Sequence, residues 1–159
     1  MFSSADRMLK ETLALLASRV PAAIDSGPHA VLETHISRVL LAGPYAFKLK
    51  RSIWLPYLDF STPEARLHAR QREFDLNRVN APRLYLSVCR IIRAAGGMLE
   101  IDGDGPLVDA TVKMRRFNQS GLFNNLVDVG PLPLSAIALL AKVIAEAHER
   151  APVSPWMPF

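Results

Sequence analysis

The sequence has few of the features that would make it a disulfide-bonded, metal-binding or membrane-spanning protein. Its single cysteine, Cys89, excludes an internal disulfide and a cysteine-rich zinc site, and is typical of a reducing compartment. The four histidines show no metal-ligand spacing. No apolar stretch approaches the ~20 residues of a membrane span, and the N-terminus lacks the features of a signal peptide. We therefore expect a cytoplasmic protein with no membrane partner and no metal site.

What the sequence does contain is an ordinary globular composition with a mild basic surplus. Half of its 159 residues are hydrophobic, and 21% are charged. This length suits one domain or two small lobes. The formal net charge of +4 permits contact with phosphate-bearing partners but does not require it.

The hydrophobic pattern predicts an α+β fold, because helices interrupt a series of antiparallel strands without the regular alternation of a parallel sheet. Turn residues at Gly43–Pro44 separate two strands that should form a hairpin. Pro56 interrupts the apolar segment 52–60, so we expect that segment to be irregular. The other predicted elements are helices over 5–20, 61–79 and 134–150, a short helix within 118–133, and strands over 83–94, 98–102 and 107–117.

The strand "YAFKLK" carries two lysines between apolar neighbours. Alternation along a strand places Ala46, Lys48 and Lys50 on one face. Two explanations remain open at this point. The lysines protect an edge strand from aggregation, or one of them holds an anion such as a phosphate.

The helix predicted over 61–79 has a clear beginning and one central acidic residue. Ser61 and Glu64 have the spacing of a capping box, and Pro63 suits the first turn. Glu73 lies in the middle of the helix. Its expected local partners, at helical spacing, are Arg70 and Asn77.

Four stretches together resemble the N-terminal part of the bacterial aminoglycoside-phosphotransferase-like proteins, which are often fused to a P-loop ATPase domain. The similarity runs from about Glu33 to His148. The stretches are, in order, "ETHISRVLLAGPYAFKLKR", "LDFST", "REFDLNRVNAPRLYLSV" and "VKMRRF".

The resemblance implies a protein-kinase-like fold. The chain would supply the N-terminal lobe, an antiparallel sheet with an inserted helix, and the first helices of the C-terminal lobe. We accordingly divide the sequence into an N-terminal helix and loop (1–30), the N-lobe (31–117), a linker with the first C-lobe helix (118–150) and a proline-rich tail (151–159).

The resemblance also implies ATP as the cofactor. Ala46 and Lys48 match the Ala-x-Lys core of the strand whose lysine meets nucleotide phosphates. Glu73 matches the glutamate that orients this lysine. We therefore expect Lys48 to contact Glu73, and Lys50 to point to solvent.

The strand over 107–117 would lead to the hinge between the two lobes. Val112 and Met114 share a face and would flank an adenine, while Arg115, Arg116 and Phe117 would offer backbone groups to it. The alternative is that Met114 fills a gap in the core, which is a common use of methionine.

The catalytic half of the family's machinery has no counterpart in the sequence. Phosphoryl transfer needs a catalytic aspartate, a nearby asparagine and a further aspartate for magnesium. The family's His-Gly-Asp-like segment is absent, and Asp102 and Asp104 have the composition of turn residues far from the nucleotide. We expect no catalytic residues, an incomplete magnesium site and no phosphate transfer by this segment alone.

The partners expected from the resemblance are a missing C-lobe, a fused ATPase domain or a second copy of the chain. Two other functions stay open: a non-enzymatic interaction module of the same fold, and a basic nucleic-acid-binding protein. The nucleic-acid-binding hypothesis rests on an arginine-rich helix. This helix lacks interleaved aromatic residues, and a solvated helix face is its simpler interpretation. The arginines of this helix and of its exit are Arg66, Arg70, Arg72, Arg78 and Arg83.

Overall fold

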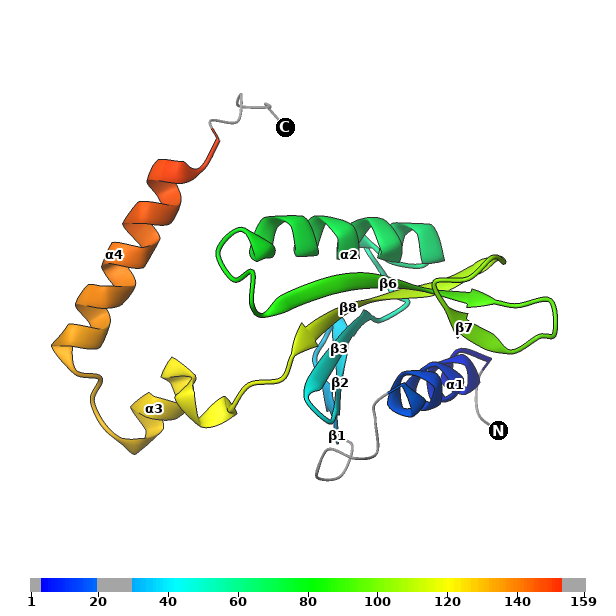
Figure 1. The fold of residues 1–159 in the computed structure, drawn as a ribbon, viewed down its shortest axis with the longest axis horizontal. Coiled ribbons are helices and arrows are strands. Elements are labelled where there is room, and N and C mark those ends of the chain that lie inside the picture. The colour runs from blue at the N-terminus through cyan, green and yellow to red at the C-terminus, as the bar shows by residue number, and fades with distance from the viewer. Residues whose placement is uncertain (1–3, 20–29, 153–159) are drawn as a thin grey trace. The chain divides into compact units, whose positions relative to one another are not determined.

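The computed structural model describes residues 4–19 and 30–152, with side chains from Arg7 onward. Most of the tail predicted over 151–159 lies outside these residues. The chain forms two compact units, which divide after Phe117. The first is a mixed α+β unit with one large antiparallel sheet, as predicted (Figure 1).

The sheet of the first unit has six strands in the order β1-β2-β3-β8-β6-β7. The predicted hairpin is confirmed, because β2 pairs with β3 across a turn in which Gly43 has a φ of 54°. The strands are β1 (Ala30–Glu33), β2 (Ser37–Ala42), β3 (Tyr45–Lys50), β6 (Tyr85–Arg93), β7 (Leu99–Ile101) and β8 (Leu107–Arg115).

The prediction that segment 52–60 is irregular is wrong. It contains a small hairpin made of β4 (Trp54–Leu55) and β5 (Leu58–Asp59). Pro56 lies in the turn of this hairpin, where its missing N–H is not needed by the pairing of the strands.

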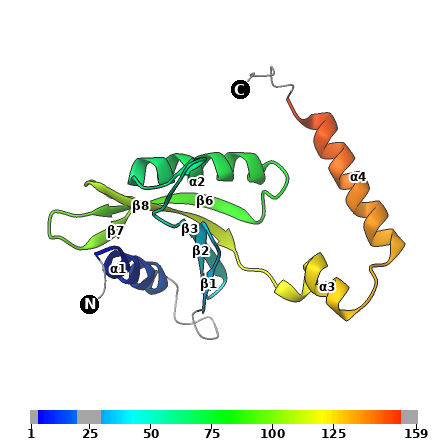
Figure 2. The ribbon, with the colours of Figure 1, turned by 180° about the vertical axis from the view of Figure 1, so that it is seen from behind.

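Two helices cover opposite faces of the sheet, as the two views show (Figures 1 and 2). Helix α1 (Ser4–Ser18) packs on the face that carries the apolar core. Its Leu16 is fully buried, and the other buried residues of this core are Leu40, Ala42, Phe47, Leu49 and Ile91. Dispersion and the hydrophobic effect therefore hold α1 in place.

Helix α2 (Pro63–Arg78) begins one residue later than a capping box at Ser61 would require. The cap is Thr62, whose Oγ1 accepts a hydrogen bond from the N–H of Ala65 at 3.1 Å. The hydroxyl of Ser61 donates instead to Asp59. The residues that α2 buries are Arg66, Arg70 and Phe74, so its attachment to the sheet is largely polar.

The second unit contains the predicted short helical segment and the predicted long helix. These are a 3-10 turn, η1 (Gln119–Gly121), followed by α3 (Phe123–Val129) and α4 (Leu134–Arg150). Among the described residues, α4 buries none of its side chains. No helix in the described ranges is long and apolar enough to cross a bilayer.

Replacing Leu16 with alanine should lower the free energy of unfolding by about 2–5 kcal/mol, because it leaves a cavity between α1 and the sheet. Leu76→Ala is the matched control. It makes the same change on α2, where the side chain is 63% exposed, and should shift stability by less than about 0.5 kcal/mol. Urea denaturation followed by circular dichroism measures both variants. Equal losses would show that α1 does not pack on the sheet as described.

Candidate functional site

Glu73 is placed between two cations that come from different elements. Its Oε1 accepts from Lys48 Nζ on β3 at 2.8 Å, and its Oε2 accepts from Arg70 Nη1, one turn earlier in α2, at 2.5 Å. The predicted contact between Lys48 and Glu73 is therefore confirmed. The local partners expected for Glu73 are also present, since its carbonyl accepts from Asn77 Nδ2 at 2.7 Å.

Arg70 is the most deeply buried member of this network. Its side chain is fully enclosed, its Nη2 lies 3.4 Å from Ser37 Oγ, and its Nε has no hydrogen-bond partner in the described part of the chain. Burial lowers the pKa of Arg70, and the charge of Glu73 opposes that effect. The carboxylate of Glu73 therefore offsets part of the cost of burying the charge of Arg70.

Lys48 lies where the network reaches the surface. Its side chain is 33% exposed, compared with 15% for Glu73. Glu73 and Arg70 thus form the buried end of the network, while the ammonium of Lys48 remains accessible to a ligand.

Lys48 lies within a largely apolar part of the sheet that we call the Lys48 face. Cross-strand partners share a face, and the register places this set in two adjacent rows, Leu32–Val39–Lys48 and Leu41–Ala46–Met114. Helix α2 packs on β8 and β6, and most of these side chains keep part of their surface exposed. The members of the Lys48 face are Leu32, Val39, Leu41, Ala46, Lys48 and Met114.

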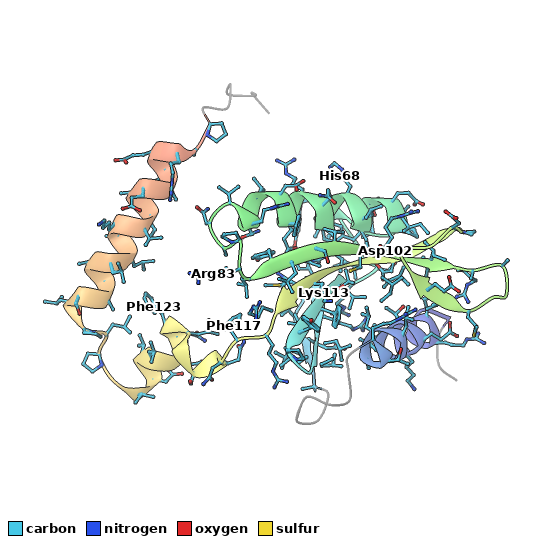
Figure 3. All side chains as sticks on the ribbon, in the orientation of Figure 1. His68, Arg83, Asp102, Lys113, Phe117 and Phe123 are labelled. Atoms are coloured by element: carbon cyan, nitrogen blue, oxygen red, sulfur yellow. The ribbon has the colours of Figure 1, made fainter. Side chains whose placement is uncertain are left out.

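Two of the backbone amides in the hinge predicted at the end of β8 form hydrogen bonds within the fold. The N–H of Arg115 donates to the carbonyl of Leu84, and the N–H of Arg116 donates to that of Pro44, both at 2.8 Å. These amides are not free for a ligand, although the sequence predicted such a role. Phe117 is 43% exposed where the chain leaves the sheet (Figure 3).

The interpretation of the arginine-rich helix as a solvated face is wrong for two of its members. Arg70 is buried as described above, and Arg66 is buried against β8, where its Nε pairs with Asp109 Oδ1 at 2.9 Å. Arg66 also donates to the carbonyls of Phe60, Ser61 and Val108. Burial raises the pKa of Asp109, and the charge of Arg66 opposes this. Both arginines serve the packing of α2, which weakens the case for a nucleic-acid-binding stripe.

Lys50 is not directed to solvent, contrary to expectation. Its Nζ lies 4.7 Å from the centroid of the Phe60 ring, and the residue is half-buried. Burial lowers the pKa of Lys50, and the nearby Arg70 lowers it further. Nothing in the local pattern of residues indicated this contact, because Phe60 lies beside Lys50 only in the folded chain, after the β4–β5 hairpin.

Tyr85 joins the network without any signal in the sequence. A bulge between Tyr85 and Ser87 shifts the alternation of β6 and sets Tyr85 opposite Met114. Burial raises the pKa of Tyr85, and the charge of Glu73 adds to the effect. Bulges are set by strand pairing, so strict alternation would misplace this side chain.

Asp102 directly follows β7, the edge strand that β6 and β8 separate from Lys48 on β3. Its Oδ1 accepts from the N–H of Arg90 on β6 at 2.7 Å. No group of three or more His, Cys, Asp or Glu side chains in the described ranges is arranged to hold a metal ion. Cys89 is buried, and burial raises its pKa, so its thiol is poorly reactive.

The chain is similar to mycobacterial proteins of much greater length. It is 35% identical over 121 residues to the uncharacterized protein Rv2004c of Mycobacterium tuberculosis and to the uncharacterized protein Mb2027c of Mycobacterium bovis. The match covers 76% of this chain but only 22% of each relative. No family profile matches the sequence, and no solved structure matches it.

Replacing Glu73 with glutamine should lower the free energy of unfolding by about 3 kcal/mol, because Arg70 would then be a buried charge without a carboxylate. Glu64→Gln makes the same chemical change at an exposed position on α2 and should cost less than about 1 kcal/mol. Urea denaturation measures both. Equal stability of the two variants would mean that the network does not hold α2.

Proposed function

We propose that this chain is the nucleotide-binding part of a protein-kinase-like domain of the aminoglycoside-phosphotransferase type. In this proposal Lys48 holds the phosphates of ATP, and the apolar residues of the Lys48 face contact the adenine. The observation that carries the proposal is the contact between Lys48 and Glu73, which joins the central strand β3 to the inserted helix α2.

The charge balance of the network supports phosphate binding by Lys48. One carboxylate serves two cations, so the group of Lys48, Arg70 and Glu73 carries a net positive charge. Arg70 holds Glu73 in place from the buried side, and Glu73 in turn fixes the ammonium of Lys48. A lysine held in this way presents its remaining N–H donors to an anion without first having to be ordered.

The neighbourhood of Lys48 supports a flat apolar group beside the phosphates. Ala46 leaves space next to β3, and Met114 lies opposite it on β8. Leu41 pairs with Ala46 from the other side and keeps part of its surface exposed. Phe117 follows directly after β8, where a hinge backbone group would meet the ring.

Transfer of the phosphate is proposed to require residues outside this segment. The 159 residues contain no counterpart of the catalytic aspartate, the asparagine or the magnesium-binding aspartate. The mycobacterial relatives extend far beyond the matched segment, so those proteins have room for such groups.

Lys48→Met should weaken binding of magnesium-ATP about tenfold or more, because it removes a charge-assisted contact with phosphate. Lys113→Met is the matched control. Lys113 lies on β8 opposite Phe47, on the other face of the sheet, where its Nζ is 4.0 Å from the centroid of the Tyr45 ring. Titrations monitored by amide NMR spectra should show unchanged affinity for this control.

Two outcomes would contradict the proposal. If ATP with magnesium shifts no amide signals of the wild-type chain, the non-enzymatic interaction module of the same fold becomes the better explanation. If the 159-residue chain transfers phosphate robustly, the catalytic groups lie within it and the assignment of an incomplete site is wrong.

A further inference from the structure

A cavity lies at the end of the sheet that is remote from Phe117. It has a volume of about 660 Å³, within the range of small-molecule sites. Its walls come from Met8 and Leu9 on α1, Lys50 at the end of β3, Leu107 at the start of β8, and Pro63 at the start of α2. Lys48 does not line it, so the cavity is separate from the Lys48 face.

The lining of the cavity is strongly cationic. It includes Arg38, Lys50, Arg51 and Arg66, and its one acidic member is Asp109. Asp109 is already paired with Arg66, and Arg38 pairs at 2.8 Å with Glu33, which lies outside the cavity. Within the described ranges, Lys50 and Arg51 form no ion pair with a carboxylate. Two positive charges on the cavity wall are therefore unbalanced.

The two unbalanced cations are fixed in position by the fold. Arg51 Nη1 donates to the carbonyl of His35 at 3.2 Å, and its backbone N–H donates to the carbonyl of Ile36 at 3.0 Å. Lys50 is half-buried above the ring of Phe60. Burial disfavours a charged ammonium, as the lowered pKa of Lys50 indicates. An anion in the cavity would offset this cost.

Apart from its charged residues, the wall consists of apolar side chains and two serines, Ser52 and Ser61. Leu9, Ile53, Leu107 and Val108 line it beside the cations. The start of α2 contributes little direct hydrogen bonding, because Thr62 already caps the N–H of Ala65 and Pro63 has no N–H to offer. The site thus combines two side-chain cations with an apolar wall.

We propose that this cavity binds an organic phosphate monoester, with the phosphate held by Lys50 and Arg51 and an apolar body against Leu9 and Ile53. A dianion matches the two unbalanced charges, and Arg and Lys are the residues best suited to phosphate oxygens. The site is distinct from the proposed nucleotide site, since neither Lys48 nor Glu73 lines the cavity.

Phenyl phosphate is the probe, titrated into the full chain and followed by amide NMR spectra. We expect the largest shifts at cavity residues such as Ser52, Ile53 and Leu107. Lys50→Met and Arg51→Met should each weaken binding about tenfold. Lys113→Met, at a lysine outside the cavity lining, should leave binding within about twofold of wild type. Benzyl alcohol, the neutral analogue, and benzoate, a monoanion, should bind more weakly than phenyl phosphate.

A measurement on the wild-type protein covers the case in which a variant fails to fold. Reductive methylation with ¹³C-formaldehyde gives each lysine a dimethylammonium NMR signal, and the signal of Lys50 is assigned by its loss in Lys50→Arg. On addition of phenyl phosphate, the Lys50 signal should shift and the Lys48 signal should not. The proposal is overturned if Lys50→Met and Arg51→Met bind as wild type does, if the shifts centre on the Lys48 face, or if benzoate binds as tightly as the phosphate.

Discussion

The carboxylate of Glu73, shared between Lys48 and Arg70, is the interaction on which the arrangement of α2 and β3 depends. Helix α2 has few apolar contacts with the sheet, and its buried side chains include two arginines. Each buried arginine needs its own carboxylate, Glu73 for Arg70 and Asp109 for Arg66, because an unpaired buried charge is strongly destabilising. The groups that attach the helix are thus also the groups that orient Lys48, so stability and the proposed site cannot be altered separately.

The two faces of the sheet are held by different physical forces. On one face, α1 and residues such as Leu49 and Ile91 form a conventional apolar core. On the other face, α2 packs through ion pairs and leaves the Lys48 face partly exposed. A non-directional hydrophobic core can support the sheet on one side, while directional ion pairs on the other keep charged groups at fixed positions.

Lys48 and Lys50 stand two residues apart on one strand, yet their surroundings give them different properties. Lys48 is paired with a carboxylate and opens toward an apolar surface. Lys50 lies over an aromatic ring, lacks a described carboxylate partner and lines a separate cavity with Arg51. One strand thereby carries two cationic positions, and the proposed nucleotide and phosphate monoester sites use one each.

Local pattern alone determined most of the elements, because hydrophobic periodicity, Gly43–Pro44 and the helix-starting Pro63 act within a few residues of chain. The contact between Lys48 and Glu73 was predicted from two sources. Alternation along the strand indicated the face of the lysine, and the family resemblance selected the glutamate. The tertiary structure decided what depends on distant segments: the burial of Arg66 and Arg70, the ring of Phe60 beside Lys50, the bulge that turns Tyr85, and the use of the Arg115 and Arg116 amides by Leu84 and Pro44. Burial and strand pairing arise from contacts between residues far apart in the sequence, so periodicity cannot reveal them.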